Sequence, residues 1–162
     1  MVEYLSGEAD LIITGSTPPG FLGEPLTTVD FIPVASPEYP LHQINHSLTN
    51  DDLKKHRPVV IRDSGFKRTI DVRWLGSEER WTVSHISTSI RLLKRNMGFA
   101  WLPTQQIRKD LNAGDLVPLN VGVNQKNSVE IFLVFPDPDS AGPAMLKLAQ
   151  IFRDQCNAVQ NS

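Results

Sequence analysis

Residues 84–103, SHISTSIRLLKRNMGFAWLP, contain the pattern from which the fold class of this chain can be predicted. Apolar side chains recur there at spacings of four, three and four: Ile86, Ile90, Leu93 and Met97. This is the spacing of one face of an α-helix, not the alternation of a strand. Gly98 is expected to end the helix, because glycine adopts the left-handed cap conformation without strain. Residues 99–102 are apolar without a helical period and predict a short buried parallel strand.

Further helices and strands are predicted on both sides of this stretch. Thr104 is placed to cap a helix over 105–113, and Gly114 marks the end of that helix. Strand-like runs occur at 11–13, 59–62 and 80–83. Strands thus alternate with helices, and parallel neighbours need helical crossovers, so the pattern predicts an α/β fold with a mainly parallel sheet.

Two longer extended segments, 26–36 and 129–135, flank this compact middle part of the chain. Such a pair can lead the chain into a second lobe and back out of it. The sequence therefore predicts two lobes joined by two crossing strands. In folds of this kind, ligands bind where strand ends and helix N-termini converge in the crevice.

Composition limits the partners and the compartment. The formal charge of the 162 residues is -2 and the basic residues look scattered, which argues against a general nucleic-acid surface. The single cysteine, Cys156, excludes an internal disulfide and fits a reducing compartment. The sequence has neither a signal-peptide pattern nor an apolar stretch of membrane-spanning length, so we expect a cytoplasmic protein without membrane contact.

Six segments, in their order and spacing, resemble the effector-binding domain of LysR-type transcriptional regulators. They are GEADLII (7–13), VDFIPVASPEYPL (29–41), DDL (51–53), VVIRDSG (59–65), MGFAWLP (97–103) and AGDLVPL (113–119). The resemblance implies a fold like that of periplasmic binding proteins, a small-molecule effector between two lobes, and dimers or tetramers on DNA. One departure is Tyr39, where the family often has histidine.

A larger departure is that the winged helix-turn-helix, the linker helix and the opening elements of the first lobe have no counterpart in the sequence. The resemblance thus implies a fragment with an incomplete first lobe over 1–34, a second lobe over 35–127, and a return strand and C-terminal helix of the first lobe over 128–162. Such a fragment reaches DNA only through the missing winged helix-turn-helix. We expect a homo-oligomer, because unpaired strand edges and apolar patches tend to find partners.

Three loops that follow predicted strands resemble the cleft-facing positions of the family. The candidate effector-binding residues are Thr14, Gly15, Ser16, Arg62, Asp63, Ser64, Gly65, Phe66, Ser84 and His85. Free amides at a helix N-terminus, small hydroxyls and an arginine can hold a carboxylate, so an anionic effector is our hypothesis. The alternative is purely structural: residues 63–65 form a turn, Ser84 caps a helix and Arg62 is solvated.

Other arrangements of reactive side chains are weaker. His42 and His46 are four residues apart, a zinc-ligand spacing on a helix, but Pro40 and the missing third ligand make solvated histidines the better interpretation. Ser84 beside His85 lacks the nucleophile-elbow pattern of a hydrolase, and we expect neither a cofactor nor catalytic residues. Three classes of function remain: a ligand-sensing regulatory domain, a solute-binding protein of a transport system, and, as the weakest, an enzyme on the same two-lobe fold.

Overall fold

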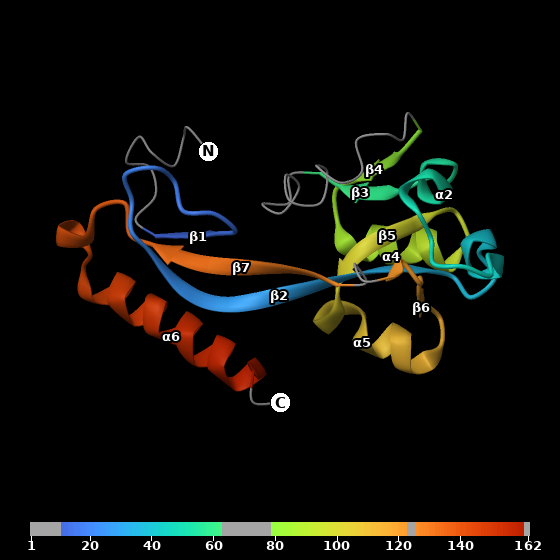
Figure 1. Ribbon diagram of the computed structural model, residues 1–162. Helices are drawn as coiled ribbons and strands as arrows, with labels where there is room; N and C mark the ends of the chain where they lie inside the picture. Colours follow the sequence, from blue (N-terminus) through green and yellow to red (C-terminus); the bar gives the residue numbers. More distant parts are fainter. Residues whose placement is uncertain (1–10, 63–78, 123–125, 161–162) are drawn as a thin grey trace. The chain divides into compact units, whose positions relative to one another are not determined.

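The computed structural model describes residues 11–62, 79–122 and 126–160, which form two compact units (Figure 1). Unit 1 contains Met1–Val29 and Val129–Ser162, and unit 2 contains Asp30–Ser128. In chain order the elements are β1 (Ile12–Thr14), β2 (Gly23–Ala35), η1 (Pro40–Gln43), α2 (Asn50–Lys54), β3 (Val59–Ile61), β4 (Trp81–Val83), α4 (Ile86–Lys94), β5 (Phe99–Pro103), α5 (Thr104–Ala113), β6 (Val117–Pro118), β7 (Asn127–Val134), η3 (Pro138–Ser140) and α6 (Pro143–Gln160).

The α/β class is confirmed, but the expectation of mainly parallel sheets needs a correction. In the larger sheet, of order β1-β7-β2-β5, β1 is antiparallel to β7, and β2 is antiparallel to both β5 and β6. β3 and β4 form a separate parallel pair. The part of β2 that pairs with β5 and β6, residues 31–35, is the end of a long strand that begins in unit 1. It is not a step in a βαβ repeat, so its neighbours can run antiparallel to it.

Helix α4 is the predicted organising helix, and its inner face packs on the core of unit 2. Leu93 is fully buried there, with Ile86 and Ile90 packed against the same cluster as Val59 and Leu102. The sequence pattern placed Met97 on this face too, which is wrong: Met97 is 38% exposed. The helix ends at Lys94, and Met97 lies beyond it.

The residue that turns the chain after α4 is Asn96, with a φ of 62°, and not Gly98 as the sequence suggested. Asparagine tolerates this conformation better than most side chains. Gly98 is required for a different reason. A Cβ atom there would lie 2.5 Å from the carbonyl oxygen of Arg57, so only glycine lets β5 approach the segment before β3 so closely.

The ends of α5 and α2 are determined by residues close to them in the sequence. Gly114 adopts the left-handed conformation at the end of α5, as predicted. Thr49 and Asp52 form a reciprocal capping box at the start of α2. Thr104 does not cap α5, because it is the first helical residue, and its hydroxyl donates to the backbone oxygen of Asp30.

Unit 1 combines β1, the first part of β2 and most of β7 with the 18-residue helix α6. Arg153 on α6 forms two hydrogen bonds of 2.7 Å to the carboxylate of Glu24 on β2. Large exposed apolar side chains gather in this unit: Ile13, Leu22, Leu146, Leu148, Ile151 and Val159. Among the described residues, none of the helices has both the length and the apolar character needed to cross a membrane.

Candidate anion site at the ends of β3 and β4

The candidate site in unit 2 is built on the parallel pair β3 and β4. Ile61 lies opposite Val83, and the backbone N–H of Arg62 donates to the carbonyl of Val83 over 2.7 Å. Parallel strands end at the same edge of a sheet, so Arg62 and Ser84 follow neighbouring strand ends. Both residues are exposed. The structure therefore brings Arg62 and Ser84, the described residues that begin two predicted loops, to the same edge.

Helix α4 begins directly behind this edge. Its N-cap is His85, whose side chain makes no capping hydrogen bond, and Ser84 lies one residue before the cap. The amides of Ile86 and Ser87 precede the first bonded amide of the helix, since Thr88 already donates to the His85 carbonyl over 3.1 Å, and the helix dipole adds partial positive charge at this end. These two amides and the Arg62 guanidinium are N–H donors of the kind that bind anions.

The other predicted residues divide into two groups. Thr14, Gly15 and Ser16 belong to unit 1, where the Thr14 hydroxyl donates to the Ser16 carbonyl over 3.0 Å and accepts the Ser16 amide over 3.3 Å. This turn therefore already uses the hydroxyl that was expected to be available for a ligand. Asp63, Ser64, Gly65 and Phe66 lie outside the described residues.

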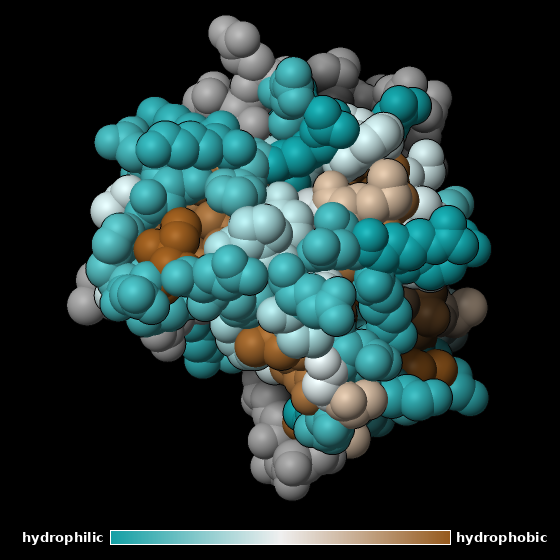
Figure 2. Space-filling view, turned by 90° about the vertical axis from the view of Figure 1, so that its right-hand side faces the viewer, coloured by the Kyte–Doolittle hydropathy of each residue, from teal (hydrophilic) through white to brown (hydrophobic). Residues whose placement is uncertain are grey.

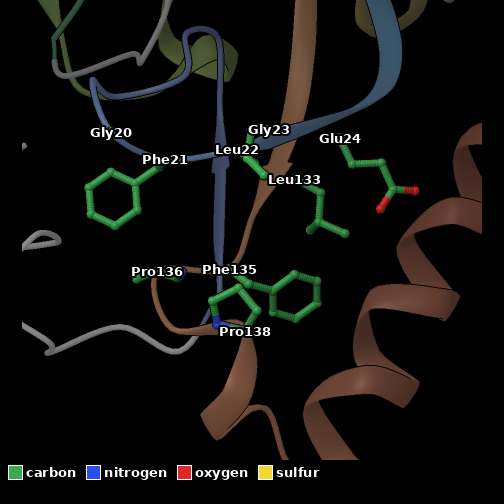
Figure 3. A pocket seen from close by; sticks show the side chains of 9 residues that line it. All are labelled: Gly20, Phe21, Leu22, Gly23, Glu24, Leu133, Phe135, Pro136 and Pro138. Atoms are coloured by element: carbon green, nitrogen blue, oxygen red, sulfur yellow. The ribbon is translucent and has the colours of Figure 1, made fainter.

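A concave surface that the sequence did not predict lies in unit 1 (Figure 3). This pocket has a volume of about 420 Å³ and is lined by Gly20, Phe21, Leu22, Gly23, Glu24, Leu133, Phe135, Pro136 and Pro138. Figure 3 shows Leu133 and Phe135 on the side toward α6, and Phe21 pointing the opposite way. Glu24 is the one ionisable group of the lining, and Arg153 already pairs with it. The pocket thus has the character of an apolar surface, and the donors for an anion lie in unit 2.

The two histidines of the predicted pair have different surroundings. His42 is on η1, and its Nε2 is buried without a hydrogen-bond partner, whereas His46 is exposed and lies 3.8 Å from Asp52. In the described part of the chain, no three histidine, cysteine or acidic side chains come together as metal ligands. Zinc needs such a set, and in the described residues His42 and His46 have no third ligand beside them.

Comparison with known proteins places this geometry in a family. The model of the LysR substrate binding domain matches residues 2–157. The probable HTH-type transcriptional regulator YhaJ of Escherichia coli (strain K12) is 30% identical over 92 residues, which cover 56% of this chain and 31% of YhaJ. The chain thus matches about a third of the length of this curated relative.

Solved structures agree with the family model. The regulatory domain of MetR, a LysR family regulator from N. meningitidis, has a TM-score of 0.77 at 19% identity over 95% of this chain and 73% of that one. The effector binding domain of QuiR, in complex with shikimate, has a TM-score of 0.70 at 19% identity over 96% of this chain and 74% of that one. At these identities the likeness concerns the fold, which is that of LysR effector-binding domains.

Proposed function

The chain belongs to the LysR substrate binding domain family, and we propose that it is the effector-sensing part of a transcriptional regulator. Its units 1 and 2 would correspond to the first and second lobes of the two-lobe domain. DNA binding would then reside in a winged helix-turn-helix elsewhere in the whole protein, as the kinship with the HTH-type regulator YhaJ suggests. A regulator of transcription works where the DNA is, so the cytoplasm is the proposed compartment.

The effector is proposed to be a small carboxylate bound through unit 2. The observation that carries this proposal is the common edge at which Arg62, Ser84 and the start of α4 meet. A guanidinium beside free helix amides suits a planar anion. QuiR, a neighbour in fold, is in complex with shikimate, which is itself a carboxylic acid. Thr14, Gly15, Ser16, His85 and residues 63–66 stay proposed contacts of the same effector.

Isothermal titration calorimetry with a panel of small carboxylic acids, shikimate among them, tests this proposal. We expect at least one acid to bind, and Arg62→Ala to weaken its affinity roughly ten- to hundredfold, the usual worth of a hydrogen bond to a charged group. Arg80→Ala is the matched control, because Arg80 is also exposed but precedes β4 instead of following β3. Equal losses in both variants, or unchanged affinity in Arg62→Ala, would contradict the proposal.

The proposed role is binding and not catalysis, because the matching family is one of substrate-binding domains. The alternative of a transport solute-binding protein shares the fold, but the match to HTH-type regulators supports the sensing role. We also propose that the chain forms a homo-oligomer through unit 1, because its apolar side chains on α6 are 40–54% exposed.

The surface of unit 2 contrasts with this apolar face. The end of unit 2 that faces the viewer in Figure 2 is mostly hydrophilic, with hydrophobic colour confined to separate patches. Trp81 and Met97 are the large apolar side chains of unit 2 that are exposed among its described residues. These observations favour unit 1 as the self-association surface and leave unit 2 to the effector.

A further inference from the structure

Asp30 and Ser128 are the first and the last residue of unit 2, and they are hydrogen-bonded to each other. The Ser128 hydroxyl donates to Oδ1 of Asp30 over 2.6 Å, and Nζ of Lys126 lies 2.7 Å from Oδ2. One carboxylate thus uses both of its oxygens to hold the segment that leaves the unit. The place where the chain enters unit 2 is tied directly to the place where it exits.

A third segment of unit 2 also meets this residue. The Thr104 hydroxyl, at the first position of α5, donates to the backbone oxygen of Asp30 over 3.0 Å. The adjacent residue pair, Phe31 with Pro103, belongs to the antiparallel ladder of β2 and β5. Asp30 is therefore fixed by its backbone to the centre of unit 2 and by its side chain to the start of β7.

The electrostatics keep this cluster charged. Partial burial raises the pKa of Asp30, but hydrogen bonds from Lys126 and Ser128 outweigh it and hold that pKa below its usual value. The carboxylate is thus ionised at neutral pH. An ion pair this exposed contributes little to global stability, since the Lys126 and Asp30 side chains are 58% and 35% exposed. This ion pair matters instead because it lies where the chain enters and leaves unit 2.

The chain passes between the units twice, at residues 29–30 on β2 and at residues 128–129 on β7. We propose that Asp30 is a positioning residue that locks these two crossings together, so that unit 2 moves on both strands as one body. β2 and β7 are also hydrogen-bonded neighbours in the larger sheet, so the Asp30 side chain adds a second link to their backbone pairing. Without this link, the backbone pairing alone would couple the two crossings, and they would move together less closely.

Pulsed electron spin resonance tests the lock without any effector, so its outcome is independent of the proposed carboxylate site. Nitroxide labels on Gln105→Cys in α5 and Asn157→Cys in α6, both exposed positions, report the distances between the units in a Cys156→Ser background. Dilution with unlabelled protein restricts the signal to pairs within one chain. We expect the distance distribution to broaden in Asp30→Asn and further in Asp30→Ala, because asparagine can still accept from Ser128.

Hydrogen exchange gives a second, local readout. Amides of β2 and β7 near the boundary should exchange about two- to fivefold faster in Asp30→Ala, as expected for the loss of an exposed ion pair. Lys126→Met, a surface change that leaves the core intact, should show the same pattern more weakly.

Asp52→Asn is the matched control, because it removes a carboxylate with two hydrogen bonds to Thr49 in the same unit but away from the boundary. It should leave the distance distribution as in the wild-type protein. Unchanged distributions in both Asp30 variants would overturn the proposal. Equal broadening in Asp52→Asn would overturn it too, since the effect would then be a general loss of stability.

Discussion

Ser89 puts a hydroxyl on the face of α4 where its neighbours are apolar. It follows Ile86 by three residues and precedes Leu93 by four, is fully buried, and its Oγ has no hydrogen-bond partner. An unpaired buried polar group costs about 1–3 kcal/mol. Ser89→Ala should therefore raise the free energy of unfolding by about 1 kcal/mol in urea denaturation, because it removes the unsatisfied group without enlarging the side chain.

Alanine also favours helices over serine by roughly 0.5 kcal/mol, so this contribution must be subtracted. Ser87→Ala, at an exposed position of the same helix, measures it. The gain in Ser89→Ala should exceed the gain in Ser87→Ala. If the two variants gain equally, or Ser89→Ala is less stable than the wild-type protein, the buried hydroxyl of Ser89 does not reduce the free energy of unfolding.

At the scale of helices and strands, the sequence could predict what local chemistry determines. The left-handed Gly114 depends on residues within one turn and was found as predicted, and the capping box of Thr49 is equally local. The antiparallel pairing of β5 with β2 depends on residues about 70 positions apart in the chain. The close approach of Gly98 to Arg57, which requires glycine, also joins residues far apart in sequence, although over a shorter span. Local patterns carry little information about such partners.

The same division applies to the candidate site. The common position of Arg62 and Ser84 could be predicted, because ends of parallel strands meet at one edge. The occupied hydroxyl of Thr14 could not, since a turn of that kind depends on its final backbone geometry. The contact of Asp30 with Ser128 spans 98 residues, and although Asp30 lies in the family-like segment 29–41, Ser128 lies in none of the six segments.

The ion pair between Arg153 on α6 and Glu24 on β2 predicts how the stability of the protein depends on pH. The hydrogen bond from Arg153 lowers the pKa of Glu24 below its usual value of 4.5 and outweighs the opposing effect of burial. A lowered carboxyl pKa adds stability above the unfolded-state value, and this stability is lost as the pH falls through the folded-state value. Arg153→Gln should thus cost under about 1 kcal/mol at pH 7, as the Glu24 side chain is 48% exposed, and nothing at a pH well below 4.5.

Denaturation of both proteins across this pH range measures the difference. Lys147→Gln, which removes the other cation of α6, is the control and should show no comparable pH dependence, since no carboxylate in the described part of the chain is paired with Lys147. A cost of Arg153→Gln that persists unchanged in acid would mean that the arginine acts through packing of its apolar stem instead.

At the scale of the whole molecule, charge is distributed very unevenly between the units. All but two of the 16 lysines and arginines belong to unit 2, the exceptions being Lys147 and Arg153. Counted along the chain, the basic residues look scattered, and only the division into units shows the asymmetry. The net charge of -2 therefore combines an acidic unit 1 with a basic unit 2. Such a charge favours small anions at unit 2, in agreement with the proposed carboxylate site.

Self-association is the last property to test at this scale. Leu148, Ile151 and Val159 lie along one side of α6 and are 40–48% exposed, next to its buried face. Ile151→Glu should raise the dissociation constant of the oligomer at least about tenfold in analytical ultracentrifugation, because it replaces apolar contact with a charge. Asn157→Asp adds the same charge on another side of the helix and should leave the constant unchanged. A wild-type protein that sediments as a monomer at high concentration would refute the proposed self-association through α6.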